Sequence, residues 1–457
     1  MIVIKFGGTS VGDDSRVSNA IEIVADARER SPVVVVSALS GVTNDLVAAT
    51  RSAAEGDFEA AAQTVARIRE RHEEVALRLV KQKSDYLESF LAQLGRHTDQ
   101  IVDILKGIAL VGDVSLRAND KIVAIGEKLS SVLFAYAMRL KTLPGVHIDS
   151  ERVVVTDERF GEAVPLLEET RRSAREVLMP ELERKHIPVM GGFIGRSSSG
   201  ATTTLGRGGS DYSASIVGAA LDAEEIQIWT DVDGMMTFDP RVIPNARIVE
   251  EIAYVEAAEL AWFGAKVLHP KTIAPAVAQQ IPIRVLNTHN RTSPGTLITE
   301  SGSAKRGPQA IAVKHGIVII HLTSSQMLGA HGFLARIFEV FDRLEVPVDL
   351  ITTSEVSVSL TIDQNRGISR LVRELEPFAG VRVDEEQSII ALVGRDLMHD
   401  TTTGATILTA LAGTSISMMS LGSSGLNLSI VVPRASADAA VQSIHRALFE
   451  HQSEVIV

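Results

Sequence analysis

The chain contains no cysteine among its 457 residues. Disulfides, thiolate zinc sites and a cysteine nucleophile are therefore excluded, and the composition suits a reducing compartment. No apolar run approaches the ~20 residues that a bilayer-spanning helix needs. The first residues, Met1 to Gly8, lack the basic start and long apolar core of a signal peptide. We therefore expect a cytoplasmic protein with no membrane partner.

Two common nucleotide-binding motifs are also missing. No G-x-G-x-x-G sequence follows an expected strand and no Walker A pattern is present, so the usual dinucleotide and P-loop sites are excluded. The formal net charge of −12 gives no general attraction to nucleic acid or to anionic membranes. A hydrophobic content of 45% and a charged content of 22% are typical of soluble globular proteins. The length allows about two to four domains.

A glycine-rich loop at residues 202–213 is the strongest local signal. It combines hydroxyl side chains, Arg207, three glycines and Asp211 between two apolar runs. The pattern predicts strand, loop and helix, with Ser210 or Asp211 as the helix cap. Glycines let a ligand approach the backbone, the helix start favours an anion, and the arginine fork suits a carboxylate or phosphate. The loop therefore predicts an anion-binding site.

Short apolar strands followed by polar loops indicate an α/β domain with a mainly parallel sheet. Residues 2–4 run into the loop at 5–10, residues 33–36 run into the loop at 37–44, and a helix is expected over 15–30. Ligands in such sheets bind beyond the carboxyl ends of the strands, so both loops belong to the expected site. Further strands are expected at 153–155, 187–190 and 226–229, and the stretch 55–112 is predicted to be helical.

The pattern changes after a segment rich in Ser, Thr, Gly and Pro at 288–309, where we place a domain boundary. Beyond it the expected order is β-α-β-β-α-β, and most of that order recurs as a repeat of about 70 residues. The second unit lacks an obvious fourth strand, which either 311–314 or 455–457 could supply. The expected domains are a catalytic domain at 1–295 and two α+β domains at 309–386 and 387–457.

These features together resemble the aspartate kinases. The motifs that carry the resemblance occur in the family's order: Ile4–Val11, the glycine-rich loop, Trp229–Gly234, Asp239–Arg241, Phe263–Pro270 and, in the tail, Ile351–Ser357. The resemblance covers essentially the whole chain and is closest to the monofunctional, lysine-sensitive type with two C-terminal ACT domains. It implies an α/β amino-acid-kinase fold followed by two ferredoxin-like ACT domains. It also implies ATP-dependent phosphorylation of the L-aspartate side chain, the first step of lysine, threonine and methionine biosynthesis.

The implied reaction needs little acid–base chemistry. The side-chain carboxylate of free aspartate, with a pKa of about 3.9, arrives as an anion and needs no general base. Catalysis should then depend on positioning and on cations around the phosphates, with Mg²⁺ bound by phosphate oxygens, waters and few protein ligands. We expect no dedicated metal site, because Asp231–Gly234 lacks the later glycine and glutamate of a calcium loop.

The resemblance implies roles for individual residues. Lys5 would face the transferred phosphoryl group, and Asp211 would orient Lys5. Arg207 would anchor a carboxylate of aspartate and Glu127 would accept its ammonium. Two hydroxyls complete the expected substrate site, at Thr43 and Ser210. The expected nucleotide contacts are Gly7, Gly8, Ser37, Thr230, Asp231, Met236, Arg241 and Lys266. Met236 stands where the family usually has tyrosine, so apolar contact is kept and a hydroxyl is lost.

The ACT resemblance implies an amino-acid effector and a homodimer or homotetramer. The turn at 327–334 precedes a helix and can offer backbone donors to an α-carboxylate. Asp349 and Glu355, expected near the ends of adjacent strands, are acceptors for an ammonium. Two acidic residues favour L-lysine over L-threonine as the feedback inhibitor. The expected effector contacts are Met327, Ala330, Phe333, Leu334, Val348, Asp349, Ser354 and Glu355.

Two alternative functions follow from the same sequence. One is another kinase of this fold, acting on glutamate, acetylglutamate or a nucleotide, and the N-terminal and glycine-rich motifs weigh against it. The other is a catalytically dead amino-acid sensor that keeps only the ACT domains. The presence of all four expected reacting groups weighs against this sensor: Lys5, Arg207, Asp211 and Lys266.

Overall fold

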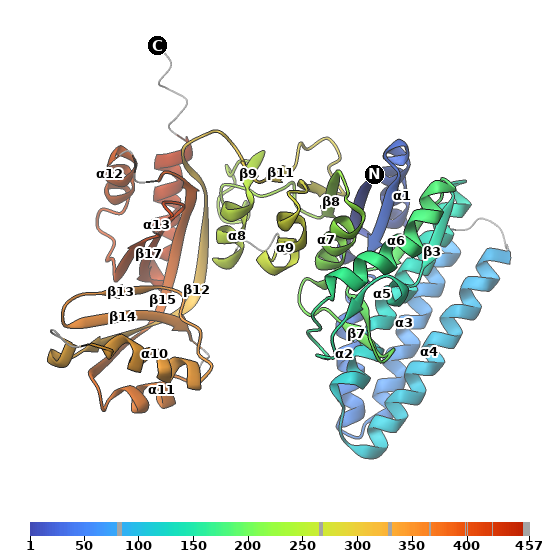
Figure 1. The fold of residues 1–457 in the computed structure, drawn as a ribbon, viewed down its shortest axis with the longest axis horizontal. Coiled ribbons are helices and arrows are strands. Elements are labelled where there is room, and N and C mark those ends of the chain that lie inside the picture. Colours follow the sequence, from blue (N-terminus) through green and yellow to red (C-terminus); the bar gives the residue numbers. More distant parts are fainter. Residues whose placement is uncertain are drawn as a thin grey trace, which may run out of the picture. The chain divides into compact units, whose positions relative to one another are not determined.

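The computed structural model describes residues 1–79, 85–264, 268–327, 331–364, 367–397, 399, 401–422 and 424–450. The chain divides into two compact units. The first comprises Met1–Met235 and Val267–Gly302, and the second comprises Met236–Lys266 and Ser303–Val457. Figure 1 shows both, coloured along the chain. Each unit has its own sheet and hydrophobic core, so each is described by itself.

A mainly parallel sheet forms the centre of the first unit, with strand order β3-β5-β2-β1-β8-β10-β11. Neighbours along this order are parallel except for the antiparallel pair β10–β11. The strand bounds are β1 Ile2–Phe6, β2 Pro32–Val36, β3 Gly145–Ile148, β5 Ile187–Gly191, β8 Glu225–Thr230, β10 Ile283–Asn287 and β11 Thr296–Thr299. β1, β2 and β5 are buried along their whole length, which explains their continuous apolar sequences.

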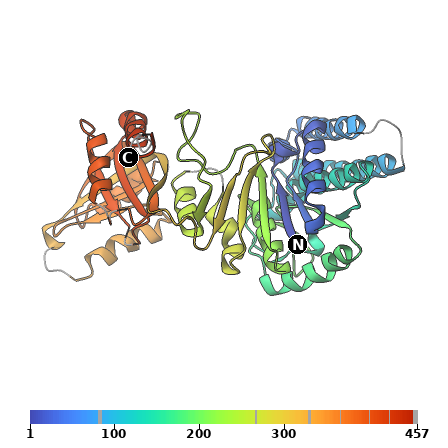
Figure 2. The same cartoon turned by 90° about the horizontal axis from the view of Figure 1, so that it is seen from above.

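Helices cover both faces of this sheet (Figures 1 and 2). Their bounds are α1 Asp14–Asp26, α5 Leu116–Leu140, α6 Leu167–Glu183, α7 Gly209–Leu221 and α9 Pro270–Ala278. Phe6 and Trp229 share a core with α1 and α5, whereas Ile226 contacts Gly218 of α7. Since successive side chains of a strand point to opposite faces, α1 and α5 lie on one face and α7 on the other. The observed helix α1 ends at Asp26, earlier than the predicted end at residue 30, because a 3-10 turn at Arg28–Arg30 follows it.

Three more helices pack against α5 as a bundle: α2 Val42–Ala54, α3 Phe58–Leu79 and α4 Asp85–Val111. The predicted helical stretch at 55–112 thus contains two helices. Val65, Ile68 and Val75 are buried on one face of α3, as the helical spacing indicates. A small sheet of β4 Val155–Thr156, β6 Ile194–Ser197 and β7 Thr202–Thr204 lies beside the main one. The strand expected at 153–155 starts at Val155, because Ser150–Arg152 forms a 3-10 turn.

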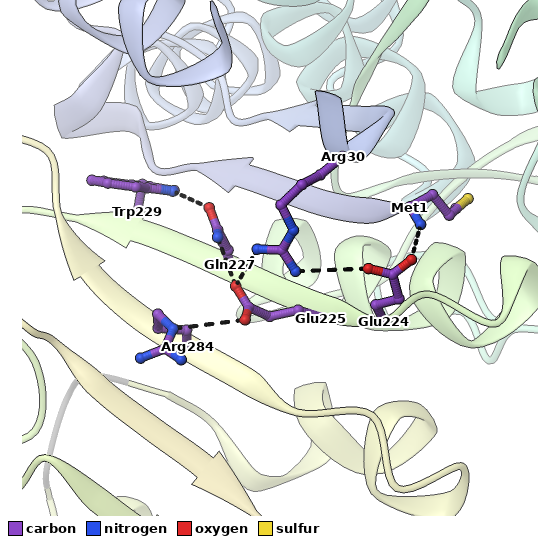
Figure 3. A network of polar contacts seen from close by, with 7 residues as sticks. All are labelled: Met1, Arg30, Glu224, Glu225, Gln227, Trp229 and Arg284. Atoms are coloured by element: carbon purple, nitrogen blue, oxygen red, sulfur yellow. Dashed lines mark hydrogen bonds and ion pairs between the residues drawn. The ribbon is translucent and has the colours of Figure 1, made fainter. Parts of the chain in front are cut away.

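A polar network fixes the end of the main sheet at which its parallel strands begin (Figure 3). Gln227 of β8 donates a hydrogen bond to Glu225 at 2.6 Å, and the Trp229 indole donates to Gln227 at 3.1 Å. Arg30 and Arg284 approach the Glu225 carboxylate to 3.4 and 3.7 Å. These side chains join the start of β8 to β10 and to the turn before β2. The polar loops that follow β1 and β2 lie at the opposite end of the sheet, where the parallel strands end.

The second unit contains one antiparallel sheet with strand order β13-β14-β12-β15-β17-β16. The strands are β12 Gly307–Thr323, β13 Ile351–Thr353, β14 Ser357–Asp363, β15 Gly380–Arg395, β16 Met418–Leu421 and β17 Asn427–Pro433. The helices are α10 Phe333–Arg343, α11 Ile368–Leu375, α12 Thr401–Ala410 and α13 Arg434–His445. α10 and α11 share one core with one half of the sheet, and α12 and α13 share a second core with the other half. β9 Glu251–Ala253 and α8 Tyr254–Trp262 also belong to this unit.

The two long strands β12 and β15 each run through both halves of this sheet. Residues 310–315 of β12 pair with 388–393 of β15, and 319–323 pair with 380–384. The sequence predicts separate strands in two domains, and the structure joins them across register shifts near His315 and Ile317. Bulges of this kind bend a ladder without ending it. Of the two strands proposed to complete the second repeat, 311–314 pairs with β15, and 455–457 lies outside the described residues.

The stretch Met236–Lys266 groups with the second unit, which differs from the predicted range 1–295. Ile243 is buried in the core that contains Ile390 of β15. The Thr237 hydroxyl also lies 2.9 Å from Nε2 of buried His445 in α13. A chain segment between two of the sequence motifs therefore packs with the second unit. None of the described helices combines the length and apolar character that a bilayer crossing requires.

Candidate active site

Two cavities of about 420 Å³ each lie at the carboxyl ends of β1 and β2. They share Ser37, Thr43 and Glu127, so they adjoin. Predicted residues that line the first are Lys5, Ser37, Thr43, Glu127, Arg207, Ser210 and Asp211. Predicted residues that line the second are Gly7, Gly8, Ser37, Thr43, Glu127 and Thr230. The structure thus brings together residues that are far apart in the sequence.

An ion pair between Lys5 and Asp211 lies in the first cavity. Lys5 Nζ is 2.6 Å from Asp211 Oδ1, and the two side chains are 9% and 17% exposed. Lys5 comes from β1 and Asp211 from the first turn of α7. The expected cap, Ser210 or Asp211, is incorrect, because Gly208 is the N-cap with φ of 71°. A left-handed cap suits glycine, and it leaves both polar side chains inside the helix start.

Asp120 anchors the glycine-rich loop and was missed by the sequence reasoning. Its buried carboxylate accepts hydrogen bonds from Thr204 N at 3.0 Å, Thr204 Oγ1 at 2.8 Å and Gly161 N at 2.9 Å. Burial raises the pKa of Asp120, and these hydrogen bonds lower it. A signal was available, since Asp120 lies two helical turns before Glu127 on the same face of α5. Asp120 therefore holds the strand that leads into Arg207.

Glu127 is a buried carboxyl with one oxygen free. Its residue is 4% exposed, and Oε2 has no hydrogen-bond partner in the described part of the chain. Burial raises the pKa of Glu127, and a hydrogen bond from the Ala38 backbone N–H opposes this only in part, so the pKa is about 8. A Cβ on Gly191 would lie 2.9 Å from the Glu127 carbonyl oxygen, so glycine lets α5 pack directly on β5. Glu127 lines both cavities, and its unpartnered oxygen can accept a hydrogen bond from a cationic ligand.

Arg71 of α3 joins the two loops that line the second cavity. Its guanidinium donates to the Ser40 carbonyl at 2.6 Å and to the Gly12 carbonyl at 3.0 Å. These carbonyls belong to the loops that follow β2 and β1. Arg71 has no motif around it, so no sequence signal could have placed it here.

Three predicted nucleotide contacts do not line these cavities, and a fourth lies outside the described residues. Asp231 does not line either cavity, and its Oδ1 accepts from the Thr230 hydroxyl at 3.2 Å. Met236 and Arg241 belong to the second unit, where Arg241 pairs with Asp239 at 2.6 Å. Lys266 lies outside the described residues. The roles of these four residues remain predictions.

The predicted effector residues lie around β13 and the start of α10. Asp349 lies just before β13, and Glu355 lies in the turn just before β14, so the two residues are near the starts of adjacent strands, as predicted. Met327 ends a 3-10 turn, and Phe333 and Leu334 begin α10. Val348 packs against the adjacent core, the Ser354 hydroxyl bonds to Ser357, and Ala330 lies outside the described residues. The roles of these residues in binding an effector remain predictions.

The chain is similar to known families and proteins along nearly its whole length. Residues 1–287 match the amino acid kinase family, and residues 320–369 and 390–448 match an ACT domain. The chain is 36% identical to lysine-sensitive aspartokinase 3 of Escherichia coli, over 98% of this chain and 99% of that protein. It is 35% identical to the chloroplastic aspartokinase 1 of Arabidopsis thaliana, over 98% of this chain and 80% of that protein.

Two solved structures resemble this one along nearly its whole length. The complex of Escherichia coli aspartokinase III with aspartate and ADP, called the R-state, gives a TM-score of 0.84 at 36% identity. It covers 98% of this chain and 100% of the other. The T-state complex of the same enzyme with lysine and aspartate gives a TM-score of 0.79 at 36% identity, over 98% and 99% of the two chains.

Proposed function

This chain belongs to the aspartokinases, and on that premise we propose that it transfers the γ-phosphoryl group of ATP to the side-chain carboxylate of L-aspartate. One observation carries the assignment. Lys5, Asp211, Arg207 and Glu127 line a single cavity at the carboxyl edge of the sheet. A turnover assay with ATP and a panel of amino acids tests it. Product from L-aspartate is expected, and turnover of glutamate, acetylglutamate or no substrate at all would contradict it.

In this reaction a carboxylate oxygen of aspartate forms a bond to the γ-phosphorus. The bond from that phosphorus to the β-γ bridging oxygen breaks, and ADP leaves. No net proton transfer is required, because both the nucleophile and the leaving group are anions. The Lys5 ammonium can stabilise the negative charge on the phosphoryl oxygens, and Asp211 holds that ammonium in place. Asp211 thus acts through Lys5 and is a positioning residue.

Two groups suit the ends of the amino-acid substrate. The planar fork of Arg207 suits a carboxylate, and no described acidic side chain pairs with it. The free oxygen of Glu127 suits the substrate ammonium. Binding of that cation would favour the ionised form of Glu127, whose pKa burial has raised.

Mg²⁺ would accompany the nucleotide in this proposal. Among the described residues, no group of three or more His, Asp or Glu could hold a metal ion. In a nucleotide site Mg²⁺ usually keeps several waters and binds substrate phosphate oxygens together with one or two carboxylates. When bound, the ion would neutralise phosphate charge. The Lys5 ammonium, from the side of β1, would then provide the protein's own cation.

Substrate affinity is expected to depend on the protonation of Glu127. With a pKa of about 8 in the free protein, the carboxyl is mostly protonated at pH 6 and ionised above pH 8. Aspartate binding needs the ionised form, so the KM for aspartate should fall about tenfold per pH unit from 6 towards 8 and then level off. Initial rates at saturating ATP across this range measure it. Glu127→Gln should raise KM and abolish the slope, and a slope that persists in this variant would exclude Glu127 as its cause.

Feedback inhibition by L-lysine is the second part of the proposal. The lysine complex of the Escherichia coli relative and the acidic residues Asp349 and Glu355 support it. Lysine inhibits if it binds an inactive arrangement more tightly than the active one, with a coupling free energy of about 1–3 kcal/mol. The homodimer or homotetramer expected from the ACT resemblance also remains a prediction, which light scattering of the purified protein would test.

Glu355→Ala is expected to relieve lysine inhibition and to leave activity without lysine unchanged. Glu355 is exposed in the turn between β13 and β14, so alanine removes charge without opening a core. A lysine titration at fixed ATP and aspartate should show a concentration for half-inhibition that is raised about tenfold or more. Glu339→Ala, on the exposed face of α10, is the matched control. Equal inhibition of wild type and Glu355→Ala would remove Glu355 from the effector site.

A further inference from the structure

An internal ammonium already occupies the carboxylate that the effector proposal assigns to the ligand. Lys314 of β12 places Nζ 2.9 Å from Asp349 Oδ1 and 2.7 Å from Asp349 Oδ2. Asp363, at the end of β14, lies 2.9 Å from the same ammonium. The Asp349 side chain is 5% exposed, Lys314 21% and Asp363 38%. The cluster thus has two carboxylates and one cation, with the ammonium held over its most buried member.

Trp262, the last residue of α8, also belongs to this cluster. The Lys314 ammonium lies 5.9 Å from the centre of the indole ring, within the range of a cation–π contact. The Trp262 side chain also donates a hydrogen bond to Asp349. α8 is tied to the other half of the sheet as well, because Asn427 of β17 donates to Glu259 at 2.9 Å. The side chain of Lys314 therefore lies between a predicted effector residue and a helix that packs with the ACT repeat.

We propose that Lys314 is a built-in competitor for the effector's ammonium, and that a cationic amino acid must displace it from Asp349 in order to bind. This inference rests on the proposed lysine regulation and goes beyond it, because it assigns a residue that holds the site closed to other ligands. Asp363 offers the displaced ammonium a second, more exposed carboxylate. Displacement would remove the cation from the face of Trp262. Ligand binding would therefore change the contacts of the last residue of α8.

The burial of the Asp349 carboxylate explains why it needs a cationic partner. Burial raises the pKa of Asp349, and the hydrogen bond and charge of Lys314 lower it. A buried carboxylate without a partner is strongly unfavourable, so either Lys314 or a ligand ammonium should be present. A neutral amino-acid side chain could not replace the charge that Lys314 supplies. The arrangement therefore selects cationic effectors, and it weakens their apparent affinity by the free energy needed to move Lys314.

The test is a calorimetric titration of the full-length protein with L-lysine. In Lys314→Met the ammonium is gone and most of the aliphatic stem remains, so the carboxylate is free for the ligand. The dissociation constant for L-lysine should fall about tenfold, because the competing state has been removed. Lys305→Met, at an exposed position before β12, is the matched control and should bind as wild type does. An unchanged or larger dissociation constant in Lys314→Met would show that Lys314 does not compete.

A second measurement needs no change at Lys314. The chain has two tryptophans, and the loss of the cation from Trp262 should alter the fluorescence of wild type on lysine addition. Trp262→Phe should lose that signal. Wild type that is inhibited by lysine without a Trp262 signal would overturn the displacement while the regulation stands. Wild type that neither binds lysine nor is inhibited by it would overturn the regulation, and this inference with it.

Discussion

Lys5→Ala should lower kcat by about 10²–10³ and change the KM for aspartate little. The Lys5 ammonium lines the cavity and is fixed 2.6 Å from Asp211, in a site where both side chains are largely buried. A preorganised cation in such a place stabilises charge as it redistributes, and water cannot replace it without reorganising. Steady-state kinetics with each substrate varied in turn measures the effect.

The control for this variant is Lys128→Ala. Lys128 lies next to Glu127 in the chain and pairs with Glu151 at 2.7 Å, with both side chains 20% exposed, but it lines neither cavity. It loses a comparable ion pair, so a general loss of stability would affect both variants. Near-normal kcat with a raised KM in Lys5→Ala would show that Lys5 contributes to ligand binding and not to stabilising the reacting phosphoryl group.

Arg207→Lys should raise the KM for aspartate by about 10- to 100-fold and leave the KM for ATP nearly unchanged. Lysine keeps the charge but loses the two parallel donors that match a carboxylate. The loop itself should be undisturbed, because Asp120 holds it through Thr204 and Gly161 and not through the arginine. Measurement of both Michaelis constants separates the two halves of the site.

Arg159→Lys provides the comparison for Arg207. Arg159 lies on the neighbouring loop, is 76% exposed and pairs with Asp157, so it reports what the loss of an arginine fork does away from the cavity. A large change in the KM for ATP in Arg207→Lys would place this side chain against the nucleotide. A large change in both variants would indicate a disturbed loop.

The parts of the fold that sequence could predict are those fixed by local pattern. Val33–Val36 is a continuous apolar run because β2 is buried on both faces, and the glycines after β1 and β2 mark the loops of the site. Lys5 and Asp211 could be paired because the family resemblance brings distant motifs together. Such a resemblance carries information about tertiary contact that periodicity alone lacks.

What sequence could not predict depends on packing between distant segments. Arg71 stands in an ordinary helix, and its role appears only when the two loop carbonyls to which it donates are in place. The continuity of β15 was missed because Glu385, Glu386 and Gln387 are polar and look like a loop. Pairing with β12 across a bulge keeps them in the strand. The burial of the Lys314 ion pair could not be predicted either, because a lysine at the end of a short apolar run usually points to water.

The continuity of β12 and β15 has a consequence for how the chain folds as it is synthesised. β12 emerges from the ribosome before either set of partner strands, and its pairing with 380–393 must wait for α10, β13, β14 and α11. β15 in turn stays unpaired on its other side until β17 has been synthesised. Long-range pairings of this kind slow folding and expose strand edges in the meantime. We therefore expect the nascent second unit to be the part of the molecule that most needs chaperones.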